Sequence, residues 1–192
     1  MNRLIIGTGN AGKVIEIREA LGEIEGWTLE PISDDTPGIE ETGETFIANA
    51  ELKARHYSRY VDDVTLADDS GLRVAALGGR PGVHSARYAP DPATRIQRLL
   101  GEMQFVDNHN RDAVFYCALA LARKGKVIWT VQAEVSGVIT RSPAGSGGFG
   151  YDPVFFLPEL NATMGQLSTE QKNRLSARGK ALAELRKYLV GP

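Results

Sequence analysis

The sequence has only one cysteine, Cys117, and no apolar run long enough to span a membrane. A single cysteine excludes a disulfide within the chain, and its place in the apolar segment 115–122 predicts a small core residue, compatible with a reducing compartment. An excess of charge of one sign is also lacking, because 22 Lys and Arg residues face 24 Asp and Glu residues, for a net charge of −2. We therefore expect no general attraction to nucleic acid or to a membrane, and any basic site must be local.

The composition that remains is that of a globular protein. Of the 192 residues, 42% are hydrophobic and 24% charged, which is enough apolar material for a sizeable core. No internal repeat, long linker or signal-peptide pattern is visible. We therefore expect a single domain over residues 1–192, with two lobes and a cytoplasmic location.

The rest of the chain is organised around the segment Val64–Leu72. A short apolar run there leads into Asp68 and Asp69, followed by Ser70 and a glycine. The run predicts a buried strand, and acids at its carboxyl end would lie where open α/β sheets hold ligands. Two adjacent carboxylates repel each other, and a hard cation such as Mg²⁺ would stabilise them. A solvated turn is the alternative interpretation.

A glycine-rich turn joins a predicted strand at 4–6 to a helix that continues past Val14. Amides at a helix start are unpaired and the helix dipole favours an anion, so the turn predicts a phosphate site, to which Lys13 adds positive charge. The glycines fit the Rossmann pattern G-x-G-x-x-G, with Glu30 as the acidic ribose partner, and the P-loop pattern G-x-x-x-x-G-K. Val14 replaces the Ser or Thr of a P-loop, and a purely structural turn remains a third interpretation.

The next part of the chain predicts a strand over Trp27–Ile32 and a helix that begins at about Phe46. Asn49, Lys53 and His56 form a polar strip beside the apolar face of that helix. A glutamate in the segment 40–44 could join the aspartates as a metal ligand. In the alternative interpretation these acidic residues bind no metal and only interact favourably with the dipole at the helix start.

Two long runs rich in β-branched and aromatic residues, 113–123 and 127–139, follow a short helix predicted after Pro92. The residues Lys124-Gly125-Lys126 separate the two runs. This arrangement predicts a β-hairpin.

A second glycine-rich segment, 142–153, contains Phe149, Tyr151 and Asp152. Glycine lets a backbone approach a ligand closely, and a purine can stack on an aromatic ring. Asp152 is expected to be extended because a proline follows it, and its carboxylate would accept the N1–H of hypoxanthine or xanthine, which adenine lacks. A loop that packs its rings inward is the alternative.

Near the end of the chain, Ser168 and Gln171 predict a capping box, and apolar residues then step by three and four to Leu189. If that helix is continuous, Lys172 and Arg178 lie on its apolar stripe. Charges there need a partner, which is a bound nucleotide in one interpretation and an internal carboxylate in the other.

Five motifs occur in order along nearly the whole chain. They are Thr8-Gly9-Asn10-Ala11-Gly12-Lys13, Glu40-Glu41-Thr42-Gly43-x-Thr45-Phe46, Ala67-Asp68-Asp69-Ser70-Gly71-Leu72, Gly78-Gly79-x-Pro81-Gly82 with Ser85-Ala86-Arg87, and Gly147-Gly148-Phe149-Gly150-Tyr151-Asp152-Pro153. With this combination the chain closely resembles the inosine triphosphate pyrophosphatase family, whose members act on non-standard purine nucleoside triphosphates. The five motifs together are more specific than the Rossmann or P-loop pattern of one turn.

The resemblance implies an α/β fold in which a mixed sheet and two lobes flank a central nucleotide-binding cleft, usually in a homodimer. It implies Mg²⁺-dependent hydrolysis of ITP, dITP and XTP to the monophosphate and pyrophosphate. Asp69 would then be the general base and a metal ligand, with Glu40 as the second ligand. The implied substrate contacts are Thr8, Gly9, Asn10, Ala11, Gly12, Lys13, Lys53, Ser70, Phe149, Gly150, Tyr151, Asp152, Lys172, Ala177 and Arg178.

One position departs from the family pattern. Where the family usually has Ser-His-Arg, this chain has Ser176-Ala177-Arg178, so Ala177 offers only backbone atoms to a base. Arg178 remains as a donor to the purine O6. The sequence therefore offers fewer side chains in support of a preference for 6-oxo purines than in support of the hydrolysis itself. The alternatives are a non-catalytic nucleotide sensor, which would release no pyrophosphate, and a Rossmann or P-loop type of nucleotide enzyme.

Overall fold

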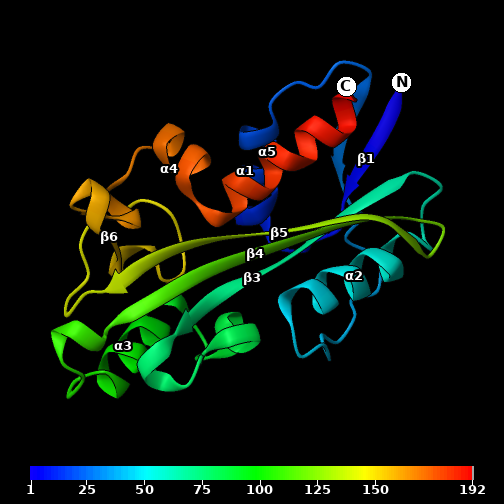
Figure 1. The fold of residues 1–192 in the computed structure, drawn as a ribbon. Helices are drawn as coiled ribbons and strands as arrows, with labels where there is room; N and C mark the ends of the chain where they lie inside the picture. Colours follow the sequence, from blue (N-terminus) through cyan, green and yellow to red (C-terminus); the bar gives the residue numbers. More distant parts are fainter. Residues whose placement is uncertain (192) are drawn as a thin grey trace. The chain divides into compact units, whose positions relative to one another are not determined.

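A computed structural model describes residues 1–191 of the chain, which form one mixed sheet and several helices (Figure 1). The strands are β1 (Asn2–Ile6), β2 (Trp27–Pro31), β3 (Val64–Val74), β4 (Asp112–Arg123), β5 (Lys126–Ile139), β6 (Phe155–Leu157) and β7 (Ala162–Thr163), and their order in the sheet is β2-β1-β3-β4-β5-β6-β7. The α-helices are α1 (Ala11–Leu21), α2 (Phe46–Tyr57), α3 (Pro92–Glu102), α4 (Thr169–Leu175) and α5 (Ala177–Val190). Short 3-10 helices lie at Ala75–Leu77, Gly82–Arg87, Asn108–Asn110, Asp152–Val154, Pro158–Leu160 and Met164–Gln166.

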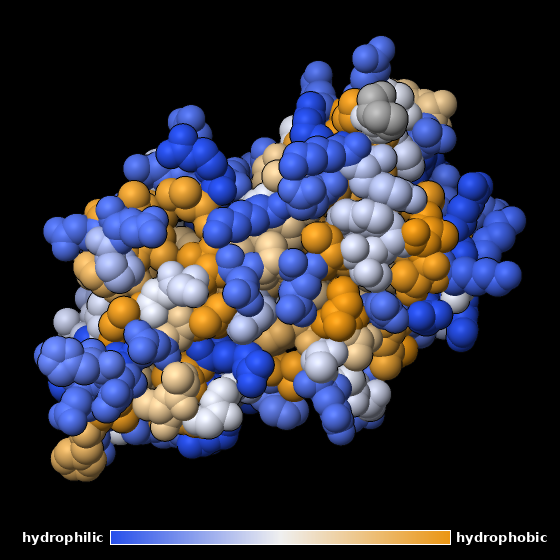
Figure 2. Space-filling model, viewed as in Figure 1, coloured by the Kyte–Doolittle hydropathy of each residue, from blue (hydrophilic) through white to orange (hydrophobic). Residues whose placement is uncertain are grey.

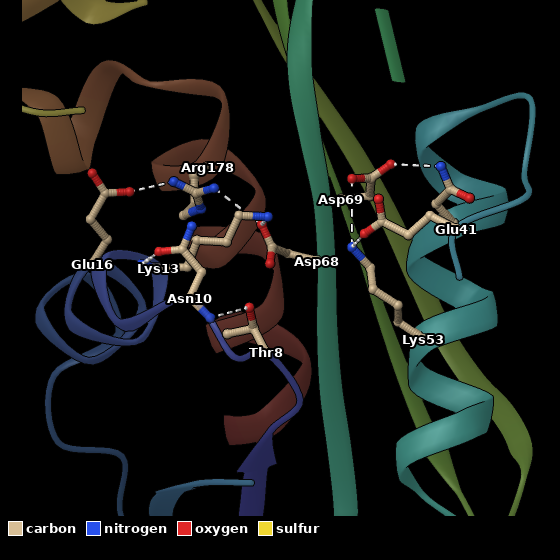
Figure 3. A network of polar contacts seen from close by, with 10 residues as sticks. Thr8, Asn10, Lys13, Glu16, Glu41, Lys53, Asp68, Asp69 and Arg178 are labelled. Atoms are coloured by element: carbon tan, nitrogen blue, oxygen red, sulfur yellow. Dashed lines mark hydrogen bonds and ion pairs between the residues drawn. The ribbon is translucent and has the colours of Figure 1, made fainter. Parts of the chain in front are cut away.

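The β1, β2 and β3 strands are parallel to one another, whereas β6 is antiparallel to both β5 and β7. The β1 and β3 strands carry buried apolar residues on both faces, as parallel strands covered by helices do: Leu4, Ile6 and Leu66 lie on one face, and Ile5 and Ala67 on the other. In Figures 1 and 3, α1 and α5 lie on one face of this part of the sheet and α2 on the other. The mixed sheet also differs from the mostly parallel sheet that a Rossmann enzyme requires.

The predicted boundary of the central strand was wrong. The β3 strand does not end before the acidic pair but continues through Asp68, Asp69 and Ser70 to Val74. The strand can continue because both carboxylates have hydrogen-bond and ion-pair partners inside the fold, as described below. Since successive side chains of a strand point to opposite faces, Asp68 and Asp69 lie on different sides of the sheet. The structure therefore does not favour a single cation bound by both Asp68 and Asp69.

The predicted hairpin is confirmed, with a two-residue turn between β4 and β5. Lys124 and Gly125 both have positive φ, 49° and 77°. These are the values of the type I′ turn, whose twist matches that of the strands it joins. The helices predicted after residues 13, 46 and 92 are also confirmed as α1, α2 and α3, and α1 begins already at Ala11.

The predicted C-terminal helix is interrupted. Ser176 is extended, with φ −67° and ψ 157°, and separates α4 from α5. Lys172 therefore belongs to α4 and Arg178 to α5, so the two charges do not share the stripe of one continuous helix. Asp152 is also not extended but begins a 3-10 helix, in which its carboxylate accepts a hydrogen bond from the Phe149 amide at 2.8 Å.

The chain folds into two compact units. Unit 1 contains Met1–Asp69, Cys117–Ala133 and the chain from Arg178 onward, and unit 2 contains Ser70–Tyr116 and Glu134–Ala177. The two units agree with the two predicted lobes, whereas the predicted cleft stays a prediction. Among the described residues, no helix combines the length and the apolar character that crossing a bilayer requires. On the face shown in Figure 2, hydrophilic and hydrophobic residues are interspersed.

Candidate active site

On the α1 and α5 side of the sheet, unit 1 contains a network of four charged side chains, of which two are buried and two half-buried (Figure 3). The Asp68 carboxylate is 1% exposed, and its Oδ2 accepts hydrogen bonds from Lys13 Nζ at 2.9 Å and from Arg178 Nη2 at 3.1 Å. Arg178 also donates to the carboxylate of Glu16. Burial acts to raise the pKa of Asp68, but the charges of Lys13 and Arg178 outweigh it and hold that pKa well below its ordinary value.

The glycine turn that carries Lys13 is held by its own side chains. Asn10 caps α1, because its side-chain oxygen accepts from the Lys13 amide at 3.2 Å, and its own amide donates to Thr8 Oγ1 at 3.2 Å. Gly7 is required by packing, since a Cβ there would lie 2.8 Å from the ring of Tyr57. Gly9, Asn10, Ala11 and Gly12 are exposed, so the predicted anion site is open to solvent.

On the α2 side of the sheet, Asp69 is the centre of a second network (Figure 3). Its Oδ2 accepts from Asn49 Nδ2 at 3.0 Å, and its Oδ1 lies 3.5 Å from Lys53 Nζ. The same ammonium donates to Glu41 Oε1 at 2.5 Å. Burial raises the pKa of Asp69; Lys53 opposes this change and Glu41 adds to it. A carboxylate with a raised pKa is better suited to accept a proton near neutral pH than an ordinary one.

The two networks differ in formal charge. On the first side, Lys13 and Arg178 balance Asp68 and Glu16. On the second side, the ammonium of Lys53 contacts two carboxylates, those of Asp69 and Glu41, so carboxylates outnumber ammonium groups among these three described side chains. The second network is therefore the one that a further cation would stabilise.

In unit 2, the second glycine-rich segment is organised around Asp152. Lys172 Nζ lies 2.7 Å from Asp152 Oδ2 and 4.7 Å from the centroid of the Phe149 ring, which is a cation–π distance. Gly148 has φ +72°, and a Cβ at that position would overlap the Asp152 carboxylate. Phe149 is 40% exposed, whereas Tyr151 is 3% exposed and donates from its hydroxyl to the Ser85 carbonyl at 3.0 Å.

The structure thus brings many of the predicted residues together within each unit. Unit 1 contains Thr8, Asn10, Lys13, Lys53, Asp69 and Arg178 in or beside its two networks, and unit 2 contains Phe149, Asp152 and Lys172 in one cluster. Each of the three lysines predicted to bind phosphate is paired with an aspartate. Arg178, predicted to contact a base, is paired with two carboxylates, and Ala177 is buried at the start of α5.

Three residues of these networks were not selected from the sequence: Glu16, Glu41 and Asn49. Glu40, the predicted second metal ligand, is exposed and makes no ion pair among the described residues, while its neighbour Glu41 contacts Lys53. The assignment of Glu40 stays a prediction. The helical spacing did place Asn49 on the polar strip with Lys53, but it predicted no role for its side chain.

Fold and site together define a mixed α/β protein with an exposed glycine turn at the start of α1 and paired lysines and carboxylates on both sides of one strand. The Ham1 family model matches residues 4–188, and the chain belongs to the Ham1 family. It is 49% identical over 190 residues to a dITP/XTP pyrophosphatase of Geobacillus kaustophilus, in an alignment that covers 96% of this chain and 93% of that protein. The resemblance inferred from the five motifs is therefore confirmed.

Two solved structures have the same fold. A HAM1 protein from Coxiella burnetii is 38% identical, with a TM-score of 0.89 and 98% of each chain covered. A nucleoside-triphosphatase, also named dITP/XTP pyrophosphatase, from Mycobacterium abscessus is 35% identical, with a TM-score of 0.76, and the match covers 95% of this chain and 98% of that one.

Proposed function

We propose that this chain hydrolyses non-standard purine nucleoside triphosphates, namely ITP, dITP and XTP, to the monophosphate and pyrophosphate. The observation that carries the proposal is the arrangement on the two sides of β3. Lys13 and the exposed glycine turn offer positive charge and a helix start on one side, and Asp69 with Lys53 offers a proton acceptor and an ammonium on the other. The names of the relatives, dITP/XTP pyrophosphatases, support the same substrate class.

We further propose that the reaction requires Mg²⁺. Within the described part of the chain no three His, Cys, Asp or Glu side chains form a complete metal site. Mg²⁺ in phosphate-handling enzymes is usually held by only one or two carboxylates together with substrate phosphates. The carboxylates of Asp69 and Glu41 fit this role, because one cation, the ammonium of Lys53, already contacts both. When bound there, Mg²⁺ would supply charge neutralisation for the phosphates.

The chain's own residues would supply the rest of the chemistry. Asp69 accepts the proton of the water that attacks the α-phosphorus, and the ammonium of Lys53 lies 3.5 Å from its carboxylate. The exposed turn at the start of α1 and the ammonium of Lys13 bind the phosphates. Lys53 and Lys172 are the further phosphate contacts that the family resemblance implies.

The remaining parts of the proposal depend on the family resemblance. They are a purine bound by the segment that contains Phe149, Gly150, Tyr151 and Asp152, a homodimer, and a cytoplasmic location. Asp152 and Arg178 both make ion pairs already, so a base that contacts them must share them with Lys172, Asp68 or Glu16. A loss of ITP preference in Arg178→Lys would support a direct contact with the base.

The experiment that tests the function is a panel of nucleoside triphosphates, with and without Mg²⁺, assayed for pyrophosphate and for orthophosphate. We expect pyrophosphate from ITP, dITP and XTP, little from ATP, and none after chelation of the metal. Tight binding without pyrophosphate release would instead indicate a nucleotide sensor. Comparable turnover of ATP and ITP would contradict the proposed preference.

The residue assignment is tested in Asp69→Asn, which keeps the size of the side chain and removes the proton acceptor. Turnover of ITP should fall by about 10²-fold or more, because general-base catalysis contributes about 10²–10⁴-fold. Asp62→Asn is the matched control, since Asp62 is 94% exposed in its side chain. A folded Asp69→Asn protein with near-normal turnover would remove Asp69 from the mechanism.

A further inference from the structure

Asn49 is a buried polar side chain that links two parts of the candidate site. It is 0% exposed and lies on α2. Its Nδ2 donates to Asp69 Oδ2 at 3.0 Å, and its Oδ1 accepts from the amide of Gly43 at 2.7 Å. The orientation of the side-chain amide is fixed from both ends, because a backbone N–H requires an acceptor and a carboxylate requires a donor.

The loop before α2 is pressed against this amide. A Cβ on Gly43 would lie 2.6 Å from Asn49 Oδ1 and 3.0 Å from Ala48 Cβ, so a side chain there would push the loop away. Gly43 follows Glu41 by two residues, and Glu41 is the carboxylate that contacts Lys53. A single side chain therefore holds both the carboxylate of Asp69 and the loop that carries Glu41.

Asn49 and Lys53 are one helical turn apart on α2 and approach different oxygens of the same carboxylate. Lys53 Nζ lies 3.5 Å from Oδ1, while Asn49 occupies Oδ2. An amide donates a hydrogen bond without adding charge, so Asp69 keeps its orientation whether or not Lys53 stays beside it.

We propose that Asn49 is a positioning residue for the hydrolysis, which fixes the Asp69 carboxylate in the orientation that accepts a proton. This inference rests on the proposed function, in which Asp69 is the general base. Asn49 itself does not touch the reacting atoms. Its effect is on the geometry of Asp69, and a displacement of about 1 Å at such a group can cost about 10²-fold in rate.

The test is Asn49→Asp, which keeps the shape and the acceptor for Gly43 but places an oxygen against Asp69. We expect kcat for ITP to fall about 100-fold while KM changes by less than about threefold, since a loss confined to the transition state lowers kcat alone. The matched control is Asn2→Asp, the same change at an exposed position of β1, which should alter neither constant. A higher KM with an unchanged kcat would overturn the proposal.

Asn49→Ala is the second variant, since it removes both hydrogen bonds of the side chain and, unlike Asn49→Asp, buries no new charge. Its crystal structure provides a readout that does not depend on activity. We expect a changed orientation of the Asp69 carboxylate while α2 stays in place; an unchanged carboxylate would overturn the inference. A wild-type protein that releases no pyrophosphate would contradict the proposed function, and this structural result would still decide whether Asn49 positions Asp69.

Discussion

At Asp68 and Asp69, one step along a strand separates two different roles. The alternation of side chains puts Asp68 with Lys13 and Arg178 on one side of the sheet, and Asp69 with Lys53 and Asn49 on the other. Asp68 therefore pairs with two cations, and Asp69 is the carboxylate to which we assign the proposed chemistry.

The role of Asp68 predicts a large effect on stability. Without the Asp68 carboxylate, the two cations Lys13 and Arg178 would share only Glu16 as a partner, so Asp68→Asn should lower the free energy of unfolding by about 3–5 kcal/mol. Urea denaturation monitored by circular dichroism measures this change. Asp62→Asn removes a carboxylate from an exposed pair with Lys124 and should have almost no effect. Equal effects of the two substitutions would show that the Asp68 network contributes little to stability.

At the scale of elements, the segment 142–153 depends on glycines with positive φ. Gly148 and Gly150 have φ of +72° and +64°. They differ in their surroundings, because a Cβ on Gly148 would overlap Asp152 whereas a Cβ on Gly150 would have no neighbour within 4 Å. Gly148 is therefore required both by its backbone conformation and because a Cβ would not fit, whereas Gly150 is required by its backbone conformation alone.

This difference predicts unequal effects of the same substitution. Gly150→Ala should be destabilised only by the left-handed backbone conformation, at about 1–2 kcal/mol. Gly148→Ala should lose more, since the ion pair of Asp152 with Lys172 must also move. Calorimetric melting of the two variants gives the comparison. Equal melting temperatures would contradict the tight packing of Asp152 against Gly148.

At the scale of the whole molecule, the single thiol reports on the integrity of the core. Cys117 is 1% exposed, and burial raises its pKa to about 12, while the charge of Arg178 acts in the opposite direction. The folded protein therefore retains a proton that the unfolded chain releases above about pH 8.5. The contribution of Cys117 to the free energy of unfolding is fully present below about pH 8.5. It is lost as the pH rises toward the pKa of the thiol in the folded protein.

The expected outcome is a difference between wild type and Cys117→Ala in alkaline solution. Between about pH 9 and pH 11, wild type should lose up to about 1.4 kcal/mol of stability per pH unit more than the variant, corresponding to one proton. Urea unfolding at several pH values measures both slopes, and groups other than Cys117 cancel in the difference. Parallel slopes would mean that the thiol ionises without unfolding.

Much of this architecture is determined by the sequence itself, because the causes are local. The Lys124-Gly125 turn fixes the hairpin, the glycine turn fixes the start of α1, and the five ordered motifs identify the family. Turn conformations and helical periodicity depend on residues only a few positions apart, so they can be derived before any fold is known.

Tertiary structure alone decided the partners of the charged residues. Asp68 meets Arg178 across 110 residues, which is why β3 can continue through two aspartates that locally resemble a turn. The selection of Glu41 rather than Glu40 beside Lys53, and the use of Asn49 to hold Asp69, likewise depend on how α2 packs against β3. A buried charge is stabilised by whatever the fold places next to it, and no local pattern of residues specifies that neighbour.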